Sequence, residues 1–234
     1  MPDKIRDLLR LALWLLPASP VKNALLRRAG HRIHATAQAR ASLVWRVASF
    51  EMGPGSSFGS ANVVKNMREI RLGRDTLLGR WNLISSHPSF VRHLPGGGAL
   101  VLGDHAKITS RHQLDCSGSV TLGAFASIAG HQSRVMSHSV DLERDAQAAF
   151  PVVIGERAFV GTRVLILGGA VLPPRSVLGA GSVLTRARGV PEPGLWAGVP
   201  AKLRGAVSGA WFDRHETSTH DLWIPETDEI VKTR

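Results

Sequence analysis

IGERAFVGTRVLILGGAVLPPRSVLGAGSVL, residues 154–184, places an apolar residue at every sixth position. These residues are Ile154, Val160, Ile166, Leu172, Leu178 and Leu184. A period of six matches neither a helix, at about 3.6 residues per turn, nor a strand, at about two. It predicts a short strand and a corner, so that three hexads close a triangular coil with the apolar residues inside. The small or β-branched residues four positions later, such as Ala158 and Ser176, are expected to let the chain turn each corner.

The same six-residue register recurs earlier in the chain in three shorter stretches. They begin at Leu72-Gly73, Leu102-Gly103 and Leu122-Gly123. Two segments interrupt the register: residues 87–99 contain a proline and three consecutive glycines, and residues 138–150 are mostly polar. We expect both to leave the coils as loops, and loops held by a rigid scaffold are common places for function.

Composition narrows the class of protein. The 234 residues include 24 Gly and 13 Pro, too many for a helical bundle. The single Cys excludes a disulfide framework and a cysteine-based zinc site, and it favours the cytoplasm. The formal charge of +11 favours an anionic partner. Because basic residues are spread along the chain, without an RNA or DNA motif and without Tyr, no specific nucleic-acid binding is expected.

The repeats resemble those of the hexapeptide-repeat acyltransferases over roughly residues 33–204. This resemblance implies a mainly β fold, a left-handed parallel β-helix, and usually a homotrimer. The ends of a solenoid need covering. We therefore expect a helical cap over residues 1–30, the β-helix domain over 31–205 and a C-terminal extension over 206–234.

Residues 120–159 resemble the family's catalytic segment, in which His138 matches the catalytic base. An imidazole suits the removal of a proton from an acceptor that attacks a thioester. Asp141 or Glu143 is close enough in sequence to orient the ring, and a backbone carbonyl could do so instead. Two further residues, His112 and Asn82, are candidates for contact with the acceptor. Weaker candidates at corners or in the core are His131, Ser86, His87 and Cys116.

Residues 179–205, GAGSVLTRARGVPEPGLWAGVPAKLRG, resemble the family's coenzyme A-binding end. The resemblance implies that Thr162 and Ala180 contact the pantetheine arm. It also implies that the nucleotide phosphates are surrounded by Thr185, Arg186, Lys202 and Arg204, where arginine and lysine both suit an anion. Trp196, beside these residues, could shelter a longer acyl chain.

The leading hypothesis is an acyltransferase that moves an acetyl or longer group, such as octanoyl, from acyl-CoA to a hydroxyl of a sugar or glycan. Acyl-CoA would be a co-substrate, with no permanently bound cofactor and no metal. Transfer to the amine of an amino sugar or amino acid is the second hypothesis, because nothing in the sequence separates the two acceptors. A γ-class carbonic anhydrase would need three zinc-binding histidines. The spacing of His112, His131 and His138 does not match that family's.

Residues 3–16 are predicted to form an amphipathic helix. Its apolar side would hold Ile5, Leu8, Leu9, Ala12, Trp14 and Leu16. This side either packs on the protein itself or makes a peripheral contact with the inner face of the membrane, helped by the basic charge. The tail is expected to dock on its own or a neighbouring coil through Trp211, Phe212 and Trp223.

Overall fold

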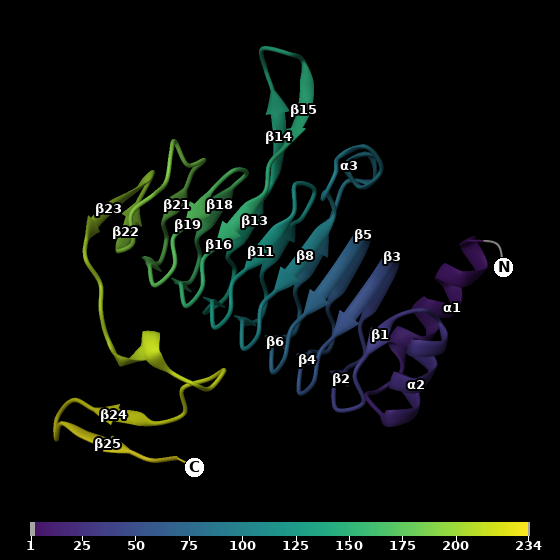
Figure 1. Cartoon of the computed structure of the whole chain (residues 1–234), viewed down its shortest axis with the longest axis horizontal. Helices are drawn as coiled ribbons and strands as arrows, with labels where there is room; N and C mark the ends of the chain where they lie inside the picture. Colours follow the sequence, from purple (N-terminus) through teal and green to yellow (C-terminus); the bar gives the residue numbers. More distant parts are fainter. Residues whose placement is uncertain (1–2, 234) are drawn as a thin grey trace.

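The computed structural model describes residues 3–233, and most of its elements are short strands (Figure 1). Parallel strands stack coil upon coil into a prism, as the hexads predicted, and the fold is the left-handed β-helix that the family resemblance implied. One face holds β1 (Arg32–Ile33), β3 (Leu43–Met52), β5 (Val63–Leu72), β8 (Ala99–Leu102), β11 (Val120–Leu122), β16 (Val152–Ile154) and β19 (Val171–Leu172).

The other two faces complete the prism. The first halves of β3 and β5 continue into the second face, which adds β7 (Leu83–Ser85), β10 (Gln113–Asp115), β13 (Arg134–Met136), β18 (Leu165–Leu167) and β21 (Val183–Leu184). The third holds β2 (Gln38–Ala39), β4 (Ser57–Phe58), β6 (Leu77–Leu78), β9 (Lys107–Ile108), β12 (Ser127–Ile128), β17 (Phe159–Val160), β20 (Val177–Leu178), β22 (Leu195–Gly198) and β23 (Ala201–Gly205).

Apolar side chains form continuous columns inside the prism. On the second face the strand register stacks Ile84, Leu114, Val135, Ile166 and Leu184 in line, and all five are buried. Adjacent strands are about 4.8 Å apart, so each residue packs directly on the next. This stacking is the physical reason for the six-residue period.

The corners are turned by a different residue from the one expected. The residue three positions after the inward apolar residue, such as Arg157 (φ 58°), Arg163 (φ 55°) or Arg175 (φ 52°), adopts the left-handed conformation. The next residue, as at Ala158 and Ser176, is fully buried inside the corner. Its small size is therefore required by space within the coil, and the preceding residue makes the turn.

Two helices, α1 (Asp3–Leu15) and α2 (Pro20–Arg28), cover the first coil. Trp14 is fully buried and its ring lies 4.5 Å from that of Phe50 and 5.4 Å from that of Phe58. Lys22 Nζ donates hydrogen bonds to the carbonyls of Trp14 and Leu16, at 2.9 and 2.7 Å. Burial lowers the pKa of Lys22 to about 8. The tryptophan thus closes the open end of the core.

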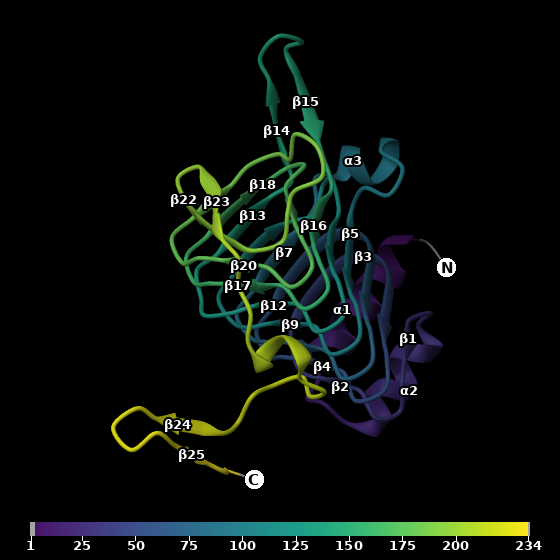
Figure 2. The same ribbon diagram turned by 60° about the vertical axis from the view of Figure 1, so that its left-hand side comes forward.

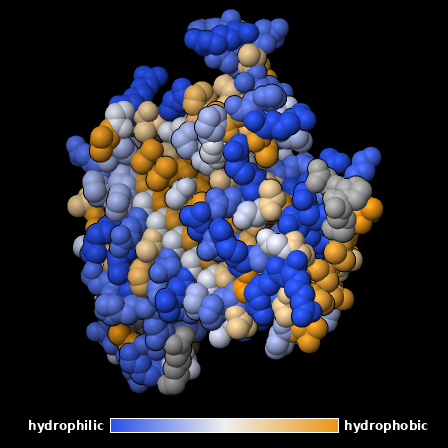
Figure 3. All heavy atoms as spheres, turned by 45° about the vertical axis from the view of Figure 1, so that its right-hand side comes forward, coloured by the Kyte–Doolittle hydropathy of each residue, from blue (hydrophilic) through white to orange (hydrophobic). Residues whose placement is uncertain are grey.

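The apolar side of α1 faces outward. The helix packs on the prism through Trp14, whereas most of the predicted apolar stripe is exposed: Ile5 53%, Leu8 57%, Leu9 47% and Leu16 42%. Apolar surface is visible at this end of the molecule in Figure 3. The expectation that this side packs on the protein itself therefore holds for Trp14 and is wrong for the rest of the stripe. Within residues 3–233, no helix is long and apolar enough to cross a membrane.

Two excursions and the tail complete the structure. The first excursion contains α3 (Pro88–His93), and the second is a hairpin of β14 (His138–Asp141) and β15 (Ala146–Ala149) that projects from the prism (Figure 1). The tail runs back along the third face (Figure 2) through a 3₁₀ turn, η1 (Ala210–Asp213), and ends in β24 (Leu222–Ile224) and β25 (Glu229–Val231). Trp211 and Phe212 dock on the chain's own coils, whereas Trp223 is 61% exposed.

Candidate active site

His138 lies at the start of β14, where the chain leaves the coil, and a buried carboxylate holds its ring. Asp115 ends β10, and coil stacking pairs it with Met136 of β13, two residues before the histidine. Asp115 Oδ2 accepts hydrogen bonds from the His138 backbone N–H at 2.9 Å and from the imidazole Nδ1 at 2.7 Å. The His138 side chain is 30% exposed and the Asp115 side chain 9%. The ring therefore keeps Nε2 for a substrate.

Asp115 is ionised because its neighbours compensate for its burial. Burial raises the pKa of Asp115, but hydrogen bonds from Ser117, His138 and Ser137 outweigh it, so that the net shift is downward. Ser117 Oγ donates to Oδ1 at 2.6 Å and Ser137 Oγ to Oδ2 at 2.9 Å. An ionised acceptor at Nδ1 favours the neutral tautomer of His138 that carries its proton on Nδ1 and leaves the Nε2 lone pair available.

Asp141 does not orient the ring, contrary to the sequence-based expectation. Its carboxylate accepts from Arg144 of the hairpin, at 2.8 Å to Nη1 and 3.1 Å to the backbone N–H. Glu143 is exposed and lies 4.0 Å from the same guanidinium. Asp115 was missed, although its sequence signal exists: it follows Leu114 in a hexad, at a position where other hexads mostly carry a small residue.

A cavity of about 410 Å³ lies beside His138 and brings it together with part of the predicted coenzyme A site. Its lining includes Asp141, Phe150, Thr185 and Arg186. The Arg186 guanidinium lies over the Phe150 ring, 3.4 Å from the centroid, a cation–π contact that positions it. Thr185 and Arg186 also line a second cavity of about 400 Å³. The two cavities therefore meet at these two residues.

The remaining predicted donor residues lie outside the His138 cavity. The Thr162 hydroxyl is engaged with the backbone of His131, to which it donates at 2.9 Å. Ala180 is exposed at a neighbouring corner. Lys202 and Arg204 are exposed on β23, and Arg204 Nε donates to the carbonyl of Ala197 at 3.2 Å. Trp196 lines the second cavity with Arg188.

His112 and Asn82 are buried in a corner away from the His138 cavity. Asn82 Oδ1 accepts from the His112 backbone N–H at 2.9 Å, and its Nδ2 donates to the Thr109 carbonyl at 3.1 Å. Both His112 ring nitrogens have partners, the Ser133 backbone N–H and the Thr109 hydroxyl. Burial lowers the pKa of His112 to about 4. Their polar atoms brace stacked coils, and their contact with the acceptor stays a prediction.

Two side chains of the first excursion lie close to the His138 ring. The ring centroids of His87 and Phe90 lie 6.4 and 5.7 Å from that of His138. The His87 backbone N–H donates to Ser117 Oγ at 2.9 Å, which ties this excursion to the hydrogen-bond network of Asp115. Cys116 is buried, and burial together with the Asp115 charge raises the pKa of its thiol, which disfavours a nucleophilic thiolate.

No metal centre is assembled within residues 3–233. No three His, Cys, Asp or Glu side chains of that range form a group that could hold a metal ion. Within residues 3–233 of one chain, His112, His131 and His138 do not form such a group.

Comparisons with known proteins agree with this architecture. No protein-family model matches the chain. It is 25% identical over 137 residues to a probable acetyltransferase, Rv3034c, of Mycobacterium tuberculosis, covering 58% of this chain and 44% of that protein. It is 27% identical over 121 residues to the putative lipopolysaccharide biosynthesis O-acetyl transferase WbbJ of Escherichia coli, covering 46% and 61%. The matched region thus spans about half the length of these relatives.

Among solved structures, a maltose O-acetyltransferase from Clostridium difficile superimposes with a TM-score of 0.50 at 14% identity, covering 88% of this chain and 86% of that one. At this identity the likeness shows a shared fold. The expected resemblance to the hexapeptide-repeat acetyltransferases is therefore confirmed, in sequence by the curated relatives and in fold by the β-helix.

Proposed function

We propose that the protein transfers an acyl group from acyl-CoA to a hydroxyl of a sugar or glycan. The observation that carries the proposal is the Asp115–His138 pair, which adjoins a cavity also lined by Thr185 and Arg186. A general base and two residues of the predicted donor site thus line one cavity, where the proposal brings the acceptor and the thioester together.

In the proposed reaction, His138 Nε2 takes the proton of the acceptor hydroxyl while its oxygen attacks the thioester carbonyl carbon. The carbon–sulfur bond then breaks, and the imidazolium returns the proton to the departing CoA sulfur. Asp115 stabilises the imidazolium through Nδ1. His138 is therefore the catalytic residue and Asp115 a positioning residue.

The donor site of this proposal follows the chain's last coils. Arg186, with Lys202 and Arg204, supplies positive charge for the CoA phosphates, and Thr185 lines the His138 cavity together with Arg186. Thr162 and Ala180 border the path of the pantetheine arm. Acetyl is the proposed acyl group because both curated relatives described above are named as acetyltransferases.

A thiol-release assay tests the proposal. Purified protein is offered acetyl-, butyryl-, octanoyl- or palmitoyl-CoA with a panel of mono- and oligosaccharides, and products are analysed for ester or amide bonds. We expect acceptor-dependent CoA release that His138→Ala abolishes, whereas His220→Ala, in the exposed tail, leaves it unchanged. Turnover that survives His138→Ala would refute the role of the base, and an amide product would establish N-transfer instead.

We further propose a homotrimer and a peripheral membrane contact. Trp81, 60% exposed, and Leu83 leave apolar surface on the second face that a neighbouring subunit would cover. The exposed stripe of α1 fits the interface of an anionic bilayer. Analytical ultracentrifugation measures the oligomeric state. Co-sedimentation with anionic vesicles measures the membrane contact, and we expect Leu8→Glu to abolish co-sedimentation. Co-sedimentation unchanged by Leu8→Glu would contradict the membrane contact.

A further inference from the structure

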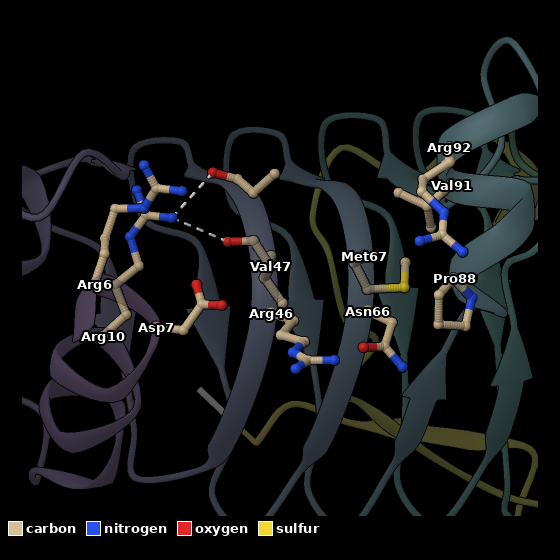
Figure 4. Close-up of a pocket in the computed structure, with 11 residues that line it drawn as sticks. Arg6, Asp7, Arg10, Arg46, Val47, Asn66, Met67, Pro88, Val91 and Arg92 are labelled. Atoms are coloured by element: carbon tan, nitrogen blue, oxygen red, sulfur yellow. Dashed lines mark hydrogen bonds between the residues drawn. The ribbon is translucent and has the colours of Figure 1, made fainter. Parts of the chain in front are cut away.

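A groove of about 290 Å³ lies between α1 and α3, across β3 and β5 (Figure 4). Its floor is largely apolar and includes Val47, Met67 and Val91. Four arginines stand around it: Arg6 and Arg10 from α1, Arg46 from β3 and Arg92 from α3. We call this feature the arginine groove.

The arginine groove concentrates positive charge. Among the described residues that line it, Asp7 is the sole acid, so four guanidiniums face one carboxylate. The pKa of Arg10 is lowered, first by burial and then by the charge of Arg6, with Asp7 acting in the opposite direction. Like charges held together cost free energy that a bound anion would recover.

The arginines differ in what they contact, and the Arg46 guanidinium lies over the ring of its neighbour Trp45, 5.7 Å from the centroid. Arg10 braces α1 against the first coils, because its Nε donates to the Ala29 carbonyl at 2.9 Å and its Nη1 to the Val47 carbonyl at 3.3 Å. Arg46 and Arg92 are exposed, one on each side of the apolar floor. Guanidiniums on opposite sides of an apolar floor suit a phosphate that carries an apolar chain.

The arginine groove is also close to the proposed catalytic base. Pro88 lines the groove and begins α3, and the preceding residue, His87, lies with its ring 6.4 Å from that of His138. Arg68 holds this excursion in place through the carbonyls of Gly97 and Leu94, at 2.8 and 2.9 Å. A six-residue helix is about 9 Å long. α3 and His87 therefore link the arginine groove to the surroundings of His138.

We propose that the arginine groove binds the anionic end of the acceptor, a phosphate attached to an apolar chain, while the sugar to be acylated extends along α3 to His138. The ligand's identity as the acceptor rests on the acyltransferase function proposed above. The inference that the groove binds an anionic amphiphile is independent of that function.

Calorimetric titration without acyl-CoA tests the binding. The probes are octyl phosphate below its micelle concentration, octyl glucoside with the same chain and no charge, and inorganic phosphate with the same charge and no chain. We expect octyl phosphate to bind about tenfold more tightly than either control. Arg46→Asn and Arg92→Gln should each weaken it about tenfold, and Arg28→Gln, the same charge change on α2, should not. Asn suits position 46 because the backbone there is left-handed (φ 54°).

The outcomes separate this proposal from the acyltransferase function. Absence of octyl phosphate binding, equal affinity for octyl glucoside, or affinity unchanged in both groove variants overturns it. If inorganic phosphate binds as tightly as octyl phosphate, the groove is a site for free phosphate. That result would overturn the proposal that its ligand carries an apolar chain. Octyl phosphate binding that follows the expected pattern supports the groove even if no acyl transfer is found. Where transfer occurs, the variants should raise KM for phosphate-bearing acceptors and leave KM for acyl-CoA unchanged.

Discussion

Asp115→Asn is the substitution that tests the proposed site most directly. The Asp115 carboxylate accepts five hydrogen bonds, two of them from Ser117, one from Ser137 and two from His138. Asn has nearly the same shape as Asp but carries no charge. Its NH₂ group would also replace one of the two accepting oxygens and face the donors that now bind that oxygen. A hydrogen bond to a charged group contributes about 1.5–3 kcal/mol. Loss of the one that stabilises the His138 imidazolium should lower kcat about 10- to 100-fold.

Steady-state kinetics of thiol release between pH 5 and 9 measure this effect. KM for acyl-CoA should change little, because Asp115 is 7% exposed and does not line the cavity. Asp145→Asn, at the exposed hairpin tip, is the matched control.

The reasoning is refuted if Asp115→Asn retains more than half of the wild-type kcat. It is equally refuted if Asp141→Asn lowers kcat as much as Asp115→Asn does. That outcome would mean that the hairpin carboxylate orients the ring during turnover.

Three further predictions concern stability and donor binding. Trp14→Ala should lower the free energy of unfolding by about 3–5 kcal/mol, because the ring is fully buried against Phe50; a denaturant titration showing under about 1 kcal/mol would contradict this. Burial, with a contribution from Arg10, lowers the pKa of His31 to about 4. Its neutral form therefore stabilises the fold above about pH 6.5, and this contribution is lost as the pH falls toward 4; unfolding of His31→Phe should depend less on pH in that window, and an equally steep loss would argue against it. Arg186→Ala should raise KM for acyl-CoA about tenfold, and Arg186→Lys less; equal KM values in all three proteins would remove Arg186 from the donor site.

Much of the fold could be read from short stretches of sequence. The hexads of residues 154–184 predicted the coils and their inward residues, because each coil repeats a local pattern of strand and corner. The breaks between the earlier hexad stretches predicted the excursions at 87–99 and 138–150. The outward stripe of α1 could not be read in this way, since an amphipathic pattern does not say which side meets the protein.

The candidate site was likewise predicted only in part from the sequence. His138 was identified because residues 120–159 resemble the family's catalytic segment, whereas its partner Asp115 is 23 residues away and was missed in favour of Asp141, three residues away. Sequence proximity favours neighbours along the chain, and in a β-helix the nearest side chains are often those of the coil above or below.

By itself, the sequence determined that this chain forms stacked hexad coils, carries His138 where a coil ends, and closes with basic residues around Arg186. The tertiary structure alone decided that Asp115 holds the base, that Asn82 and His112 brace a corner, and that arginines from residues 6 to 92 surround one groove. The reason is physical: the repeat is a local property of six residues, but the number of residues between stacked positions changes with every excursion. Which side chains meet across coils is therefore fixed when the coils stack.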